Sequence, residues 1–354
     1  MSPYRFIVIL TIVLLLTGCS APAAKELTLT VMTHDSFNIS EQVVETFEQE
    51  NGVQVVFLKS GDAGSVLNRA ILSKKAPQAD VLYGVDNTFL SRALSEDLFE
   101  PYESANLAQV NPEFLVNTSS LVTPIDYGDV CINYDIAYFN ERNLTVPRSL
   151  ADLLKPEYGK GTGRDGLLVV ENPATSSPGL AFLLATIAEY GEEGYLDYWR
   201  GLKANGTVVV NDWEIAYYTN FSGSSGRGLQ PMVVSYATSP VAEVIYAAEP
   251  ITEAPTASIT GTNTCFRQVE YAGILKGTKN LPLARRFIDF MLDTTFQEDL
   301  PLQNFVYPVN PAAKIPEEFI RYAQVPLHPA VLDPALIAAK RDQWISDWTE
   351  VMLR

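Results

Sequence analysis

Residues 27–85 read LTLTVMTHDSFNISEQVVETFEQENGVQVVFLKSGDAGSVLNRAILSKKAPQADVLYGV, and this stretch decides the fold class of the chain. Three short segments rich in β-branched and aromatic residues predict strands: 27–32, 53–58 and 80–85. Between the first two, Asn38 is expected to cap a helix and Gly52 to end it. A second helix is expected at 65–73. Because strand and helix alternate, the stretch predicts an α/β fold with largely parallel sheets.

The alternation of strands and helices continues through the rest of the chain with one interruption. The pattern pauses at Thr123–Asp129 (TPIDYGD) and restarts with a strand at Val130–Tyr134. Later apolar segments predict four further strands: 167–170, 207–210, 232–236 and 269–275. The last helix is expected from about Asp333 to Leu353. Removal of an N-terminal signal leaves about 335 residues, the length of two ordinary domains.

The N-terminus has the composition of an export signal, which we place at residues 1–19. Arg5 supplies a positive charge, Phe6–Leu16 is an apolar run interrupted only by Thr11, and a small-residue cleavage site follows. The run is much shorter than the roughly 20 residues that a spanning helix needs. The ending Leu-Thr-Gly-Cys resembles a bacterial lipobox, which implies a lipid on Cys19 and leaves residues 20–26 as a tether. An ordinary signal peptide with a chance cysteine is the alternative.

The chain is acidic, with 25 basic and 42 acidic residues and a formal net charge of −17. Nucleic-acid phosphates demand a basic surface, so this charge argues against a nucleic-acid partner. Acidity suits a cationic ligand, although many exported proteins are acidic for solubility alone. No segment after the signal is long and apolar enough to span a bilayer, so we expect membrane attachment through lipid only.

Residues that carry enzyme chemistry are few in this chain. Cys131 and Cys265 are able to form one disulfide outside the cytoplasm, and the sequence leaves their pairing open. His34 and His328 show no zinc spacing, and no G-x-S-x-G elbow accompanies them. We therefore expect no catalytic residue, no metal site and no cofactor. An exported two-domain α/β chain of this kind is typical of a solute-binding protein, whose lobes close on a ligand about a hinge.

Nine short segments carry a resemblance to a known family, and they occur in the family's order over nearly the whole chain after the signal. They are THDSF (33–37), SVLNR (65–69), ADVLYGVDN (79–87), IDYG (125–128), TSSPGL (175–180), DWE (212–214), SYATSP (235–240), YPV (307–309) and RDQWISDW (341–348). With these segments the chain resembles the thiamine-binding receptors of ABC transporters.

The resemblance implies a two-lobed type II periplasmic-binding fold, of class α/β, with central mixed sheets. Residues 27–123 and 269–354 would form the first lobe, and residues 124–268 the second. Hinge strands are implied near Pro124–Gly128 and near Thr262–Gln268.

The same resemblance implies a receptor that captures thiamine, or thiamine phosphates, and delivers it to the permease of an ABC importer. Such a receptor performs no chemistry. We expect it to act as a monomer, held by its lipid anchor in the periplasm or at the outer face of the cell membrane.

Thiamine carries a permanently positive thiazolium ring, which aromatic faces and carboxylates attract. Trp213 matches a ligand contact of the family, although an arbitrary indole is more often packed in a core. Asp62 and Ala63 match a contact pair in the turn GDAG, and a turn or helix-capping role is the alternative for Asp62. The family has glycine in place of Ala63, so the backbone there is expected to approach the ligand less closely.

Two serines and a strand end complete the implied site. Ser176 and Ser177 precede Pro178 at a helix N-terminus, where they are expected to hold a phosphate or the hydroxyethyl end of thiamine. Helix capping by Ser177 is compatible with this role. Four further residues end a strand, the place where α/β proteins bind ligands: Tyr236, Ala237, Thr238 and Ser239.

Two of the implied site residues depart from the family pattern. Phe305 stands where the family has a tryptophan that packs on the ligand, so it keeps a π face but loses an N–H donor. His34 stands where the family has a tyrosine, and a protonated His34 in the cleft would repel the thiazolium. Asp126 and Tyr127 face the cleft or serve the hinge, which the sequence leaves open.

Three other functions remain open from the sequence. Related receptors bind ferric iron through adjacent tyrosines, which Tyr217-Tyr218 superficially offers, although helical spacing from Trp213 favours core packing. A polyamine receptor would need several carboxylates and aromatic rings. Thiaminase I resembles the same fold and uses a cysteine nucleophile, for which Cys131 is the candidate, but no activating base is evident near it.

Overall fold

The computed structural model describes residues 27–118, 120–160, 165–225 and 228–354. The expected signal peptide, Cys19 and the tether at 20–26 lie outside these residues. Within the described ranges, no helix combines the length and the apolar character needed to cross a bilayer.

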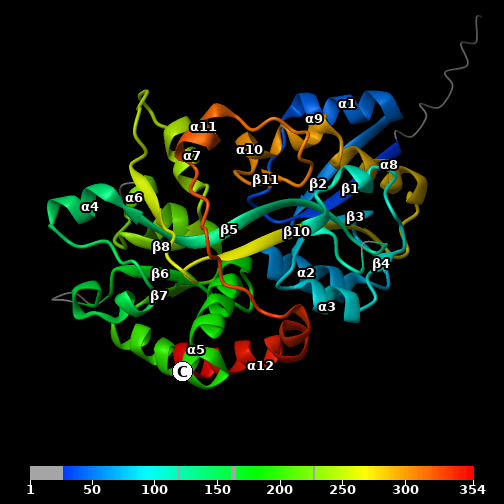
Figure 1. Ribbon diagram of the computed structural model, residues 1–354. Coiled ribbons are helices and arrows are strands. Elements are labelled where there is room, and N and C mark those ends of the chain that lie inside the picture. The colour runs from blue at the N-terminus through cyan, green and yellow to red at the C-terminus, as the bar shows by residue number, and fades with distance from the viewer. Residues whose placement is uncertain (1–26, 119, 161–164, 226–227) are drawn as a thin grey trace, which may run out of the picture.

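Eleven strands of the described chain belong to one mixed sheet (Figure 1). Their bounds are β1 Leu27–Thr33, β2 Val53–Lys59, β3 Val81–Asp86, β4 Phe99–Glu100, β5 Thr123–Asp135, β6 Leu168–Glu171, β7 Val208–Val210, β8 Met232–Tyr236, β9 Thr256–Ile259, β10 Phe266–Leu275 and β11 Tyr307–Pro308. The sheet order is β2-β1-β3-β10-β5-β8-β6-β7, with β4 beside β10, and β9 and β11 beside β5.

The sheet is parallel at its two ends and antiparallel in its middle. β1 runs parallel to β2 and β3, and β6 runs parallel to β7 and β8. β5 and β10 are antiparallel to each other and to their outer neighbours. The largely parallel sheets predicted from the alternation are therefore one mixed sheet, because two long central strands reverse direction.

The helices cover both groups of strands. Their bounds are α1 Glu41–Asn51, α2 Ala63–Ser73, α3 Leu90–Ser95, α4 Ile136–Glu141, α5 Ser177–Ala204, α6 Ser222–Ser225, α7 Ser239–Ile245, α8 Leu281–Met291, α9 Thr294–Gln297, α10 Leu300–Gln303, α11 Glu317–Tyr322 and α12 Pro334–Met352. Short 3-10 turns lie at Leu107–Gln109, Pro112–Phe114, Ala151–Leu154 and Pro156–Tyr158, and a π-helix spans Ile215–Asn220.

Local sequence signals explain several helix ends. Asp62 caps α2 by accepting from the Ala63 N–H, and Gly52 ends α1 in the left-handed conformation with φ 60°. The start of α1 differs from the prediction, because Ser40 rather than Asn38 is its N-cap. Asn38 instead forms side-chain and backbone hydrogen bonds with Gln303 and Asn304.

The predicted pause in the pattern is part of the thirteen-residue strand β5. The alternation of apolar and polar residues that marks a strand is not visible here in the sequence. The reason is that two acidic residues are buried within the strand, each with a partner. Asp126 accepts a hydrogen bond from the Tyr83 hydroxyl, and Asp129 accepts two from the Arg267 guanidinium at 3.0 Å. A carboxylate that finds a partner can be buried in a strand, and sequence periodicity does not register the partner.

Two groups of elements lie on either side of β5 and β10, which pass through the centre of Figure 1. One group contains β1 to β3 with α1, α2 and α8, and the other contains β6 to β8 with α4 to α7. The C-terminal helix α12 returns to pack on α5, where Trp199 and Trp348 meet with ring centroids 5.5 Å apart. Residues 269–354 thus contact both groups, and the division into lobes at 123/124 and 268/269 stays a prediction.

A disulfide joins Cys131 of β5 to Cys265, which directly precedes β10. Ala237 packs against this pair in a small buried cluster. The pairing that the sequence left open is thus formed, and it holds the two central strands together at the side of β8.

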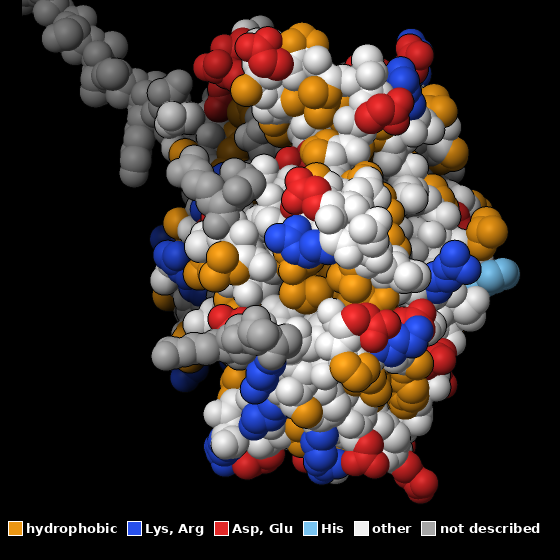
Figure 2. All heavy atoms as spheres, turned by 90° about the vertical axis from the view of Figure 1, so that its left-hand side faces the viewer, with side chains coloured by type: hydrophobic (Ala, Val, Ile, Leu, Met, Phe, Trp, Pro, Cys, Tyr) orange, Lys and Arg blue, Asp and Glu red, His pale blue; other side chains and the backbone are white. Residues whose placement is uncertain are grey.

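The surface shows no single charged field on the face seen in Figure 2, which turns the left-hand side of Figure 1 toward the viewer. Small groups of acidic side chains alternate there with Lys and Arg and with scattered hydrophobic side chains. This face therefore does not gather the net acidity of the chain into one patch.

Candidate functional site

A cavity of about 300 Å³ opens between the two groups of elements. Its walls come from the loop after β1, the start of α2, the start of α5, the segment after β7, the end of β8 and the segment after α10. Because these are strand ends and helix starts from distant parts of the chain, polar groups converge on the cavity, as α/β folds typically arrange at ligand sites.

One wall of the cavity is an aromatic cluster around Trp213. The Tyr217 ring stacks on the indole at a centroid distance of 5.0 Å and 19°, and Tyr218 meets it edge-on at 5.5 Å. The indole Nε1–H donates to Ser235 Oγ at 2.9 Å, which fixes the orientation of the ring. Tyr236 completes the wall. A flat, electron-rich wall of this kind attracts cationic rings.

Asp62 forms the acidic corner of the cavity and connects its two sides. Its carboxylate caps α2 and also accepts from the backbone N–H of Trp213 at 3.2 Å. A second bond crosses nearby, from the Gly64 N–H to the Thr175 carbonyl at 3.0 Å. Burial raises the pKa of Asp62, while the Ser176 hydroxyl and the two N–H donors hold it down.

The N-terminus of α5 faces carboxyl groups of the protein itself. The Ser177 hydroxyl donates to Asp86 Oδ2, and the Thr88 N–H donates to the other oxygen at 2.7 Å. Burial raises the pKa of Asp86, and burial together with the Asp62 charge raises that of Glu171 well above its usual value. The anion-binding end of α5 is therefore already supplied with acidic partners.

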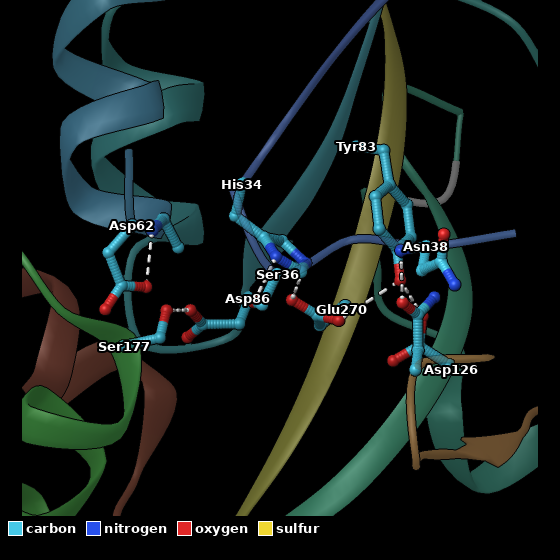
Figure 3. Close-up of polar contacts among 11 residues, drawn as sticks. His34, Ser36, Asn38, Asp62, Tyr83, Asp86, Asp126, Ser177 and Glu270 are labelled. Atoms are coloured by element: carbon cyan, nitrogen blue, oxygen red, sulfur yellow. Dashed lines mark hydrogen bonds and ion pairs between the residues drawn. The ribbon is translucent and has the colours of Figure 1, made fainter. Parts of the chain in front are cut away.

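A chain of polar side chains runs from the cavity wall into the sheet (Figure 3). His34 Nε2 lies 3.5 Å from Glu270 Oε1. Behind Glu270, the Tyr83 hydroxyl lies 3.2 Å from Glu270 Oε2 and donates to Asp126 Oδ2 at 2.6 Å. The loop after β1 and the strands β3, β5 and β10 thus contribute one residue each to a buried polar cluster beside the cavity.

Phe305 also lines the cavity, with a left-handed backbone at φ 55°. The Thr238 hydroxyl donates to its carbonyl oxygen, and its ring stacks on Phe319 at 6.3 Å and 13°. A non-glycine residue in this region is strained and persists only where the surroundings hold it, which is common at ligand sites.

Comparison with known proteins identifies a family and several relatives of this chain. Residues 76–327 match the family model of the bacterial extracellular solute-binding proteins. The thiamine-binding periplasmic protein of Salmonella typhimurium is 31% identical over 350 residues, covering 96% of this chain and 98% of the relative. That of Escherichia coli K12 is 30% identical with the same coverage. A solved periplasmic thiamin-binding protein superposes with a TM-score of 0.81 at 28% identity, covering 94% of this chain and 98% of that one.

This chain belongs to the bacterial extracellular solute-binding protein family. The expected fold class, a two-lobed α/β type II periplasmic-binding fold with a mixed central sheet, is confirmed. Proteins of this family bind solutes rather than transform them.

Most of the residues predicted for the site line this one cavity. They are His34, Asp62, Ala63, Ser177, Trp213, Tyr236, Ser239 and Phe305. Three others are buried behind it: Ser176 beside Asp62, Ala237 against the disulfide, and Thr238 under Phe305.

Several cavity residues escaped the sequence reasoning. They are Glu214, Tyr246, Glu270, Gln303 and Asn304, while Tyr217 and Tyr218 entered only as a possible iron-binding pair. Tyr217 lies four residues after Trp213 on a helical turn, a spacing that predicts core packing. Tyr217 is indeed buried and stacks on the indole, and it also lines the cavity. Glu270 carried a weaker signal, an acidic residue in an otherwise apolar strand.

Proposed function

We propose that this chain is the substrate-binding lipoprotein of an ABC importer, and that it captures thiamine in this cavity and delivers it to a membrane permease. One observation carries the proposal: an aromatic wall at Trp213 faces acidic groups, with Lys59 the one lysine or arginine among the described residues that line the cavity. Such a lining suits a flat organic cation. The names of the relatives point to the same ligand.

In this proposal the thiazolium lies against the Trp213 wall, close to Asp62. Ser177, Ser239 and Tyr236 offer hydroxyl groups to the pyrimidine edge and the hydroxyethyl end. Phe305 closes the rim as the second aromatic face. Ser176, Ala237 and Thr238 support the wall from behind, and only their backbone atoms would meet the ligand.

The cysteines bear on the alternative of a thiamine-cleaving enzyme. Cys131 is bound to Cys265, so it has no thiolate to offer as a nucleophile. We therefore propose that the protein binds thiamine without transforming it. Incubation with thiamine followed by chromatography should return the vitamin intact.

The iron alternative rests on Tyr217 and Tyr218, which both line the cavity. The Tyr217 hydroxyl is already engaged with Glu243 Oε1 at 2.8 Å, and its ring stacks on Trp213. The described residues contain no group of three His, Cys, Asp or Glu side chains placed to hold a metal ion. Organic cation binding uses this wall as it stands, whereas iron binding would require it to rearrange.

We further propose that Cys19 carries the lipid that holds the receptor at the membrane, with residues 20–26 as its tether and a monomer as the working form. Mass spectrometry of the N-terminal peptide from membranes would detect diacylglyceryl-Cys19. An unmodified peptide released into the medium would contradict the anchor without touching the ligand claim.

Calorimetric titration of residues 20–354 against thiamine, thiamine phosphates, spermidine and ferric citrate tests the function. We expect one thiamine per chain with micromolar or tighter affinity, and no heat with ferric citrate. Binding of spermidine or iron in preference to every form of thiamine would overturn the proposal.

A further inference from the structure

His34 and Glu270 form an ion pair in the cavity wall. Both side chains are only 13% exposed, so solvent screens the pair weakly. The Nδ1 of His34 lies 2.8 Å from Ser36 Oγ, which orients Nε2 toward Glu270 (Figure 3). The ring packs closely over Gly84, where a Cβ would meet Cδ2 at 2.6 Å. The imidazole is thus held in place rather than free to swing out.

Of the two neighbouring carboxyl groups of Glu270 and Asp126, Glu270 carries the negative charge. Glu270 and Asp126 occupy facing positions of β10 and β5, and Tyr83 reaches both carboxyl groups. Two buried carboxyl groups this close do not both ionise. Burial and the Glu270 charge raise the pKa of Asp126 well above its usual value. Burial alone would raise that of Glu270, but His34, Asp126 and Tyr83 together lower it.

We propose that Glu270 is a carboxylate that meets the positive charge of the ligand, and that ligand and proton compete for it through His34. When His34 is protonated, the pair is neutral and offers a cation little. When His34 is neutral, Glu270 presents an uncompensated negative charge to the cavity. Capture of a cationic ligand therefore expels the His34 proton. This inference rests on the proposed function, since it presumes a cation in this cavity.

The groups around His34 set the direction of the pH dependence. Burial lowers the pKa of His34, but the Glu270 carboxylate more than offsets this and raises it overall. Asp62 at the start of α2 also raises it, and Lys59 at the end of β2 lowers it. Tyr83 packs against the ring from β3. Affinity should therefore fall as the pH falls through the His34 pKa, by up to about tenfold per pH unit.

Calorimetry in two buffers of different ionisation enthalpy counts the protons that binding releases. We expect thiamine binding to release a fraction of a proton that approaches one per chain between about pH 6 and 7. His34→Gln should bind thiamine with no proton release and with an affinity that no longer changes over this range. The matched control is His328→Gln, because His328 is the other histidine of the chain and is exposed outside the cavity.

Glu270→Gln separates the carboxylate from the histidine. We expect at least a tenfold weaker affinity for thiamine and loss of proton release, with cooperative thermal unfolding retained. Thiamine binding by the unaltered protein with no proton release, or proton release that persists in His34→Gln, would overturn the inference while leaving the receptor function intact. Absence of thiamine binding altogether would instead contradict the proposed function.

Discussion

The backbone N–H of Trp213 donates to the carboxylate of Asp62 at 3.2 Å, although the two residues lie 151 positions apart in the chain. Asp62 caps α2 on one side of the cavity, and Trp213 follows β7 on the other. The bond exists only while the two sides are close. A ligand that touches both residues would therefore also stabilise the closed arrangement of the protein.

Trp213→Ala should weaken thiamine binding without unfolding the protein. Removal of the indole costs about 0.5–2 kcal/mol of cation–π attraction, or roughly 2- to 30-fold in Kd. Trp213→Phe should lose less, because a π face remains although the donor to Ser235 is gone. Calorimetry with a parallel thermal melt separates the two effects. Equal affinity of Trp213→Ala and the unaltered protein would remove Trp213 from the site.

Asp62→Asn should weaken binding of the cation while keeping the helix cap. The amide oxygen can still accept from the Ala63 N–H, so α2 is retained, but the negative charge is lost. We expect a change of about 1 kcal/mol or more in binding free energy and little change in melting temperature. Asp97→Asn is the control, because Asp97 is exposed and pairs with Lys276 away from the cavity. A similar loss in both variants would contradict a local role.

Free thiamine should bind more tightly than its phosphate esters. The cavity lining contains Asp35, Asp62, Glu214 and Glu270, while the Lys59 ammonium already donates to the Asp35 carbonyl at 2.8 Å. Each added phosphate charge should cost roughly 1 kcal/mol, or about fivefold in Kd. Titration with thiamine, its monophosphate and its diphosphate at fixed ionic strength ranks them. Tighter binding of the diphosphate would contradict this ranking.

Removal of the disulfide should destabilise the fold more than it alters binding. Cys131 and Cys265 close a loop with a separation of 134 residues, for which loop-closure entropy predicts about 5 kcal/mol and measured cases typically give about 2–4 kcal/mol. Cys131→Ser combined with Cys265→Ser should lower the free energy of unfolding in urea accordingly. Thiamine affinity should change less than about threefold, since neither cysteine lines the cavity. An unchanged unfolding midpoint would contradict this prediction.

Glu171→Gln should flatten part of the pH dependence of stability. Burial raises the pKa of Glu171 in the folded protein. The folded state therefore holds a proton that the unfolded state has lost, and stability falls as the pH rises from the unfolded pKa through the folded one. The glutamine side chain does not ionise, so the variant should lack this loss of unfolding free energy, which is worth up to about 1.4 kcal/mol per pH unit. Urea unfolding of the variant and of the unaltered protein at about pH 5 and pH 8 measures how the unfolding free energy of each changes with pH. An equal change in the two proteins would contradict the assignment of this proton to Glu171.

The sequence by itself determined the elements and most of one wall of the site. Strands such as β1 and β8 and helices such as α2 follow from local periodicity, because burial of one face recurs at a fixed spacing along the chain. Resemblance supplied Asp62, Trp213 and Tyr236, which share one cavity. Periodicity alone did not place the strand that crosses TPIDYGD, because two partnered acidic residues interrupt the apolar pattern.

Only the tertiary structure decided which distant polar groups meet. The pairing of β5 with β10 brings Asp126 opposite Glu270, while the loop after β1 and the middle of β3 bring His34 and Tyr83 to them. The same pairing sets Cys131 beside Cys265. Periodicity reports whether a residue is buried but not what it is buried against. The charge of a buried carboxyl group depends on that partner, so the electrostatics of this site appear only once the fold has formed.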